Sequence, residues 1–317
     1  MKTEKKLLIV SVLCFLLILP VWIKCTEDKT SFTFAHISDP HMFAAGSSTD
    51  EQGNNSTQRL SYLVNKLNTR NLDFTILTGD FASVDGNNTA EWDNFNETIS
   101  ELNTIKYFCK GNHDGIDNDY FYEYTGQNTT YYFDVNNIRF LVIGNEETFL
   151  VSGTCGINIT KVQAEYIKDA IEGQDNIWLV AHYPEKVSAS SYWNDVTLIE
   201  DLKSKLIGWS SGHEHNGRAI SNSSGYIEDQ PRSPTLYSND NTSILVWSEI
   251  SVTPTSINVT QYDAYTNKII DTAVYSVDLS YPSAFPCVEL IVGSIIATVS
   301  LLLIFAIVSH RNKSHKI

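Results

Sequence analysis

The residues that could carry chemistry in this chain lie in five short segments, each directly after a run rich in apolar residues. The segments are Asp39-Pro40-His41, Gly79-Asp80, Gly111-Asn112-His113-Asp114, His182 and Gly212-His213-Glu214-His215. Loops at the carboxyl ends of strands are where α/β folds place their sites, so we expect the five segments to converge. Two carboxylates, one amide and four imidazoles form an oxygen and nitrogen shell that suits two divalent ions such as Mn, Fe or Zn.

The spacing within the segments fits shared ligation. Residues two apart on an extended segment point to the same side, so Asp39 and His41 can chelate one ion, and His213 and His215 can span a pair. Asp80 is then free to bridge the two ions. Each segment taken alone is a common turn or cap. However, only one of the six histidines before the C-terminal tail falls outside the five segments, which argues against chance placement.

Strand and helix patterns alternate around these segments. The expected strands cover residues 32–38, 74–78, 105–109, 177–181 and 207–209, and the expected helices cover residues 60–67, 92–102, 160–171 and 197–206. Ser56 or Thr57 would cap the first helix. A hairpin over 131–143 turns at Asn136 and Asn137, and residues 236–277 have a strand pattern only. This alternation predicts an α/β fold in which helices cover the faces of a sheet.

Both ends of the chain are apolar. Residues 1–25 place three lysines before an uncharged apolar stretch, which is typical of a secretory signal peptide, with an uncleaved anchor as the alternative. Residues 288–309 contain 19 consecutive uncharged residues, and at ~1.5 Å per residue these can cross a hydrocarbon layer of ~30 Å. The following tail, 310–317, is basic, and basic residues beside a span stay cytoplasmic. We therefore expect a single-pass type I membrane protein whose ectodomain, residues 26–284, is extracellular or lies in a lysosomal or secretory lumen.

Glycosylation sequons and charge add to this interpretation. The ectodomain contains Asn-x-Ser/Thr at Asn54, Asn55, Asn87, Asn96, Asn128, Asn158, Asn222, Asn241 and Asn258, which is typical of a glycoprotein. The chain has a formal net charge of −15, and its two ends contribute +3 and +2, which leaves −20 on the rest. Such an acidic surface argues against nucleic acid as a partner. A phosphate group would need local positive charge, which two metal ions would supply.

In this order and at these spacings, the motifs D-x-H, GD, GNHD, H and GHxH resemble those of the calcineurin-like metallophosphoesterase superfamily, over about Phe32 to Arg218. The resemblance implies an α/β fold that is a four-layer α/β/β/α sandwich, a binuclear metal site on the loops between its two sheets, and hydrolysis of phosphate esters. By this resemblance one ion would be held by Asp39, His41, Asp80 and His215, and the other by Asp80, Asn112, His182 and His213. It also implies that His113 is the catalytic histidine and that Asp114 orients it.

The sequence says less about the substrate. Ser83 stands where purple acid phosphatases have a metal-binding tyrosine, and the arginine-rich continuation of phosphoprotein phosphatases is absent after Asp80. The basic residues near the motifs are Arg59, Lys110, Lys186 and Arg218, and we expect each to be a solvated surface charge.

Without a visible basic clamp, an acidic ectodomain repels a phosphodiester, with one negative charge, less than a monoester with about 1.5 to 2. We therefore expect a small phosphodiester as the substrate. The alternatives are a phosphomonoesterase of the acid phosphatase type and a metal-bound cell-surface binding module without turnover. The presence of His113 argues against the binding module.

Overall fold

The computed structural model describes residues 31–43, 54–82, 88–115, 118–146, 148–151, 154–184, 195–215, 220–221, 225–231 and 245–279. The predicted signal peptide (1–25), transmembrane helix (288–309) and tail (310–317) lie outside these residues. Among the helices that the structure describes, none is both long enough and apolar enough to cross a membrane.

The first sheet combines the N-terminal strands with the C-terminal ones. Its order is β14-β13-β12-β1-β2-β3. Its strands are β1 (Phe32–Ile37), β2 (Phe74–Leu77), β3 (Ile105–Phe108), β12 (Val246–Val252), β13 (Ser256–Asp263) and β14 (Ile269–Ser276). β1, β2 and β3 are parallel to one another, whereas β12 runs antiparallel to β1. The carboxyl ends of the three parallel strands therefore meet at one edge, where the first three predicted ligand segments begin.

The second sheet has the order β10-β11-β9-β8-β5-β4. Its strands are β4 (Thr130–Val135), β5 (Ile138–Ile143), β8 (Ile177–Ala181), β9 (Leu206–Ser210), β10 (Ile220–Ser221) and β11 (Ile227–Asp229). The strands β5, β8, β9 and β11 are parallel, so the segments after β8 and β9 share an edge as well. A separate antiparallel pair is formed by β6 (Thr148–Val151) and β7 (Thr154–Ile157). Helix α4 (Asn118–Thr125) packs on the first half, where Phe121 belongs to the core of the first sheet and Tyr124 stacks on Trp92.

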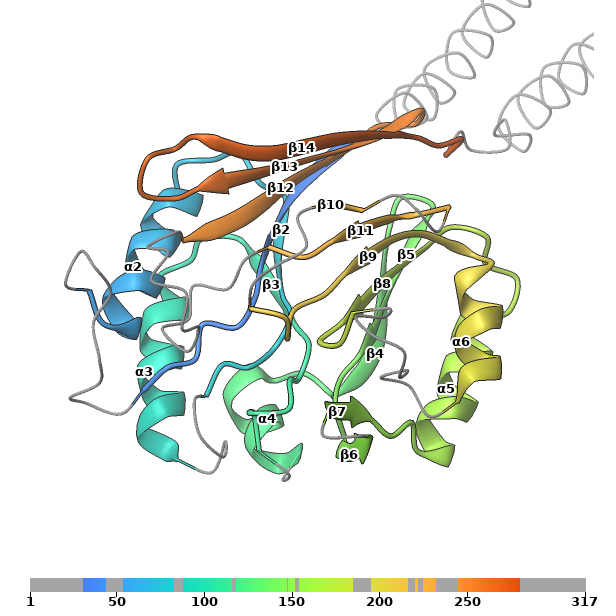
Figure 1. The fold of residues 1–317 in the computed structure, drawn as a ribbon, viewed down its shortest axis with the longest axis horizontal. Helices are drawn as coiled ribbons and strands as arrows, with labels where there is room; N and C mark the ends of the chain where they lie inside the picture. Colours follow the sequence, from blue (N-terminus) through green and yellow to red (C-terminus); the bar gives the residue numbers. More distant parts are fainter. Residues whose placement is uncertain are drawn as a thin grey trace, which may run out of the picture. The chain divides into compact units, whose positions relative to one another are not determined.

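Helices cover the outer face of each sheet, and the inner faces pack on each other (Figure 1). Helices α2 (Ser56–Leu67) and α3 (Thr89–Ser100) lie on the first sheet, and α5 (Lys161–Ile171) and α6 (Val196–Lys203) lie on the second. Between the sheets is an aromatic core in which Phe34 of β1 contacts Phe140 and Trp178 edge to face, at ring-centroid distances of 5.5 and 5.2 Å. The predicted mixed α/β fold with two sheets is confirmed.

One local prediction is wrong. The first helix is capped by Asn55 and not by Ser56 or Thr57, because the Asn55 side chain accepts a hydrogen bond from the Gln58 backbone N–H while the Gln58 side chain accepts one from the Asn55 N–H. This reciprocal pair satisfies two N–H groups at the start of the helix, which a cap one residue later would leave open.

Candidate metal centre

The five predicted segments meet where the parallel strands of both sheets end. Asp39, Asp80 and Asn112 follow β1, β2 and β3, whereas His182 and His213 follow β8 and β9. Backbone hydrogen bonds join the first two loops, from the N–H of Asp39 to the carbonyl of Gly79 (3.0 Å) and from the N–H of His41 to that of Asp80 (2.9 Å). The structure therefore brings together residues from positions 39 to 215 of the chain.

The first ligand group consists of Asp39, His41, Asp80 and His215, which each offer a ligand atom within 4.8 Å of the others. The Nε2 atoms of His41 and His215 lie 3.0 Å apart. The Nε2 atom of His41 is 3.5 Å from Asp80 Oδ2, and that of His215 is 3.5 Å from Asp39 Oδ1. Imidazole nitrogens and carboxylate oxygens that converge in this way fit a divalent cation.

The second ligand group consists of Asp80, His182 and His213. The Nε2 atom of His182 is 3.2 Å from Asp80 Oδ2 and 2.9 Å from Asn112 Oδ1, and the same Asn112 oxygen is 3.0 Å from His213 Nδ1. The amide of Asn112 therefore belongs with this group. Because Asp80 belongs to both groups, its carboxylate is placed to bridge two ions, as the sequence predicts.

The charges in the two groups suit metal binding. Burial alone would raise the pKa of Asp80, but the charge and hydrogen bond of His182 outweigh it and hold that pKa well below its ordinary value. Burial lowers the pKa of His41 and of His213 to about 4, which keeps both imidazoles in the neutral form that binds metals. At His182 burial is outweighed by Asp80 and Asp39, which raise the pKa to about 9. A bound cation would replace the proton that His182 then carries.

The backbone around the ligands is held by close packing. A methyl group added to Gly111 would overlap the Asp80 carboxylate, and one added to Gly212 would overlap Ser38 and the Asp39 carboxylate. The Nδ1–H of His182 donates to the carbonyl of Thr78 at 2.7 Å, which leaves Nε2 directed at the ligand group. Sequence reasoning missed the role of Thr78, because a backbone carbonyl has no signature in residue type.

His113 lies beside the first group without joining it. Its backbone N–H donates to Asp80 Oδ1 at 2.8 Å, and its ring meets that of His41 edge to face with 5.0 Å between centroids. This position is suited to a proton donor next to the ions.

The Asp114 carboxylate has a different environment from the one that the resemblance implies. It is buried, and each of its four hydrogen bonds comes from a backbone N–H: those of Asp80 (2.9 Å) and Gly111 (2.7 Å) to Oδ2, and those of Phe81 (2.6 Å) and Ala82 (3.1 Å) to Oδ1. Burial, with the charge of Asp80, raises the pKa of Asp114 to about 6, against the lowering effect of these donors. Asp114 therefore ties the loop after β3 to the loop after β2.

The expectation that the nearby basic residues are solvated is wrong for two of them. Arg59 is 3% exposed and Lys110 is 0% exposed. Arg59 lies on the inner face of α2 one turn before Leu63, and Lys110 follows β3 into the interior. Lys186 and Arg218 lie outside the described residues, as does Ser83.

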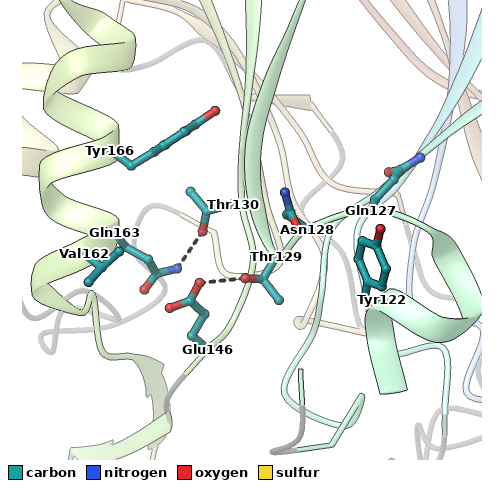
Figure 2. Close-up of a pocket in the computed structure, with 9 residues that line it drawn as sticks. All are labelled: Tyr122, Gln127, Asn128, Thr129, Thr130, Glu146, Val162, Gln163 and Tyr166. Carbon is teal, nitrogen blue, oxygen red and sulfur yellow. Dashed lines mark hydrogen bonds between the residues drawn. The ribbon is translucent and has the colours of Figure 1, made fainter. Parts of the chain in front are cut away.

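A separate hollow of about 340 Å³ lies between α4, α5 and the start of β4 (Figure 2). None of the predicted ligands lines it. Several of its polar groups bond to one another: Gln163 donates to Thr130 Oγ1 at 2.8 Å, and Thr129 donates to Glu146 at 2.6 Å. Gln127 is also engaged, by Phe108 and Tyr131. These bonds stabilise the wall of the hollow, and the metal-ligand groups remain the candidate site.

Comparison with known proteins gives a family and a fold. The sequence model of the family described as calcineurin-like phosphoesterase matches residues 32–217. A dimetal phosphatase from Danio rerio superposes with a TM-score of 0.59 at 13% identity, over 77% of this chain and 98% of the other. The purple acid phosphatase PPD1 from yellow lupin (Lupinus luteus) seeds superposes with a TM-score of 0.52 at 13% identity, over 78% of this chain and 54% of the other. A search of curated proteins found no match.

Proposed function

The chain belongs to the calcineurin-like phosphoesterase family, a family of metal-dependent phosphoester hydrolases that use two divalent metal ions, and we propose that it hydrolyses a small phosphodiester on the extracytoplasmic side of a membrane. The observation that carries the proposal is the shared position of Asp80. Its carboxylate lies 3.5 Å from His41 in one ligand group and 3.2 Å from His182 in the other.

In this mechanism the protein side chains have three tasks. Asp39, His41, Asp80 and His215 would hold one ion, and Asp80, Asn112, His182 and His213 would hold the other. The ions, when bound, supply the positive charge that neutralises the phosphoryl oxygens. His113 donates a proton to the leaving oxygen. Asp114 positions His113 through the backbone, because it fixes the loop that carries both residues to the loop of Asp80.

The preference for a diester rests on charge. Arg59 and Lys110 are buried, so two of the four basic residues near the motifs are not on the surface that a dianionic monoester would approach. The two ligand-group aspartates reduce the charge of two divalent ions to a net +2, which supplies the local positive charge that a phosphate ester of either kind needs in an acidic ectodomain. The alternative is a phosphomonoesterase, which is favoured by the similarity in fold to a dimetal phosphatase and to a purple acid phosphatase.

The extracytoplasmic location is supported by the chain ends and by the sequons. The segment at 1–25 has the pattern of a signal peptide, and that at 288–309 has the pattern of a membrane span. Among the residues that the structure describes, the sequon asparagines Asn96, Asn128 and Asn258 are exposed, so each can carry a glycan without disturbing the core. The ectodomain at 26–284 would then be glycosylated in a type I orientation.

The experiment compares two substrates on one preparation. The full chain, purified in detergent and loaded with Mn²⁺, is assayed with a bis-aryl and a mono-aryl phosphate. We expect a kcat/KM ratio above one in favour of the diester. A ratio well below one identifies a phosphomonoesterase, and no turnover of either ester by a chain that carries two ions identifies a binding module.

A further inference from the structure

A buried polar cluster lies between the two sheets. Its centre is Asp229, the last residue of β11 in the second sheet, and its other members come from β1, β12 and β13 of the first sheet. Asp229 Oδ2 accepts from His36 Nδ1 at 2.7 Å, and Oδ1 accepts from Ser248 Oγ at 2.7 Å and from Gln261 Nε2 at 2.9 Å. All four side chains are at most 1% exposed. Burying the Asp229 carboxylate between the sheets would cost free energy without these three donors, so the donors fix its position.

One branch of the cluster leads to His182. The other ring nitrogen of His36, Nε2, lies 2.8 Å from the hydroxyl of Thr78. The carbonyl of the same Thr78 accepts the Nδ1–H of His182 at 2.7 Å. The orientation of a metal-binding histidine depends on the group that holds its second nitrogen. The Asp229 carboxylate thus acts on His182 through His36 and Thr78.

The second branch leads to His213. The backbone carbonyl of Asp229 accepts the N–H of Ser211 at 3.0 Å, and Gln230 Nε2 donates to the carbonyl of Gly212 at 2.5 Å. Ser211 and Gly212 are the two residues before His213. Gln230 is 2% exposed, so water does not compete for this bond. The two residues at the end of β11 therefore hold the loop that presents His213.

The first branch ends at His182 of the second ligand group, and the second branch holds Gly212, which directly precedes His213 of that group. His215 of the first group lies two residues further along the same loop, and the backbone N–H of His213 donates to the Asp39 carboxylate at 3.1 Å. The loop that carries Asp39 and His41 of the first group is held in another way, by backbone bonds to the carbonyls of Gly79 and Asp80 in the first sheet. Asp229 and Gln230 also lie beyond the residues that the family model matches, which end at 217.

We propose that Asp229 and Gln230 are positioning residues for the second metal subsite. They fix the groups that hydrogen-bond to His182 and the loop that carries His213. This inference rests on the proposed function, because it requires two bound ions. Its expected consequence is asymmetric: loss of either residue weakens binding of the second ion more than binding of the first, because His215 is the one first-group ligand on the loop that Gln230 holds.

Gln230→Leu tests the proposal with little change in side-chain volume. Gln163→Leu is a matched control, because Gln163 is also 2% exposed and its Nε2 also donates to a glycine carbonyl, that of Gly144 at 3.1 Å, but on the side of α5. Mn²⁺ is titrated into the metal-free full chain in detergent, and bound ions are counted by electron paramagnetic resonance, which separates a coupled pair from a single ion. Thermal unfolding of each metal-free variant measures any general loss of stability.

We expect the wild type to bind two ions per chain and Gln230→Leu to bind the second ion roughly 10- to 100-fold more weakly, with a smaller loss of affinity for the first ion. Gln163→Leu should bind both ions with wild-type affinity, even if its unfolding temperature falls by as much as that of Gln230→Leu. On a His215→Ala background, which retains the second subsite, Gln230→Leu should weaken binding of the remaining ion, whereas on a His182→Ala background its effect on the remaining ion should be smaller.

Two wild-type affinities in Gln230→Leu would overturn the proposal, as would equal weakening of both ions. Equal behaviour of the two glutamine variants would also overturn it. A wild type that binds fewer than two ions would overturn the proposed function, and the positioning role with it. Asp229→Asn provides a second variant, with the same asymmetric loss expected.

Discussion

Asp114→Asn tests the role that the structure gives to this carboxylate. Each of its two oxygens accepts two backbone N–H groups, from Asp80 and Gly111 on one side and from Phe81 and Ala82 on the other. An asparagine keeps one oxygen and turns the other into an NH₂ donor, so two N–H groups lose their acceptor. A buried unsatisfied group costs about 1–3 kcal/mol, so we expect a loss of about 2–6 kcal/mol. This is a large part of the roughly 5–15 kcal/mol by which a domain is stable.

The assay is urea unfolding of the metal-free chain, followed by tryptophan fluorescence. Asp114→Asn should lower the urea midpoint strongly without a change in slope. Asp134→Asn is the control, because Asp134 is a half-exposed aspartate whose pair with Arg139 at 2.9 Å lies at the surface, where the effect should be small. An Asp114→Asn chain that unfolds at the wild-type midpoint, yet loses activity most with poor leaving groups, would refute this reasoning. It would mean that Asp114 acts on the proton of His113.

Four further outcomes are expected. Asp80→Ala should abolish binding of both ions, and two ions retained per chain on metal analysis would contradict the bridging position. His113→Ala should keep both ions and lose about 10²- to 10⁴-fold in kcat, most with poor leaving groups, and a parallel loss of metal would contradict a proton-transfer role. Gly111→Ala should lower metal occupancy, because its methyl group would overlap the Asp80 carboxylate, and normal occupancy would show that the loop can move aside. A chain expressed in a glycosylating host should lose mass on treatment with glycosidase, and the loss should be smaller in the Asn128→Gln and Asn258→Gln variants than in the wild type. An unchanged mass would contradict the extracytoplasmic orientation.

The positions of the ligands could be predicted because they depend on the strands before them. Apolar runs such as 74–77 and 177–181 are visible in the sequence, and a parallel sheet gathers whatever follows their carboxyl ends. The alternation of strands and helices predicted an α/β fold for the same reason, whereas its arrangement in two sheets was implied by the family resemblance. The hairpin of β4 and β5 was predicted from Asn136, which has the left-handed backbone that its turn requires.

What could not be predicted depends on contacts between segments far apart in the chain. Asp114 bonds to backbone N–H groups more than thirty residues earlier, and spacing within its own motif does not indicate them. The burial of Lys110 was missed because a charged residue next to a motif is ordinarily solvated. The helix cap, by contrast, depends on a local contact: Asn55, Ser56 and Thr57 are all good helix caps, but of the three only Asn55 has a glutamine three residues later, with which it forms the reciprocal bond.

The backbone of the site shows why a local pattern of residue types is not enough. Of the six non-glycine residues with positive φ in the described part of the chain, four are predicted ligands: Asp39 (51°), His41 (41°), Asp80 (53°) and His213 (68°). The other two are asparagines, and asparagine and aspartate adopt this conformation more readily than most residues, for which it costs about 1–2 kcal/mol. Glycine would remove that cost but would also remove the ligand. The strain at the ligands is therefore kept by the surrounding hydrogen bonds, among them those of Asp114 within the first sheet, those of the Asp229 side chain between the sheets and that of Gln230 within the second sheet.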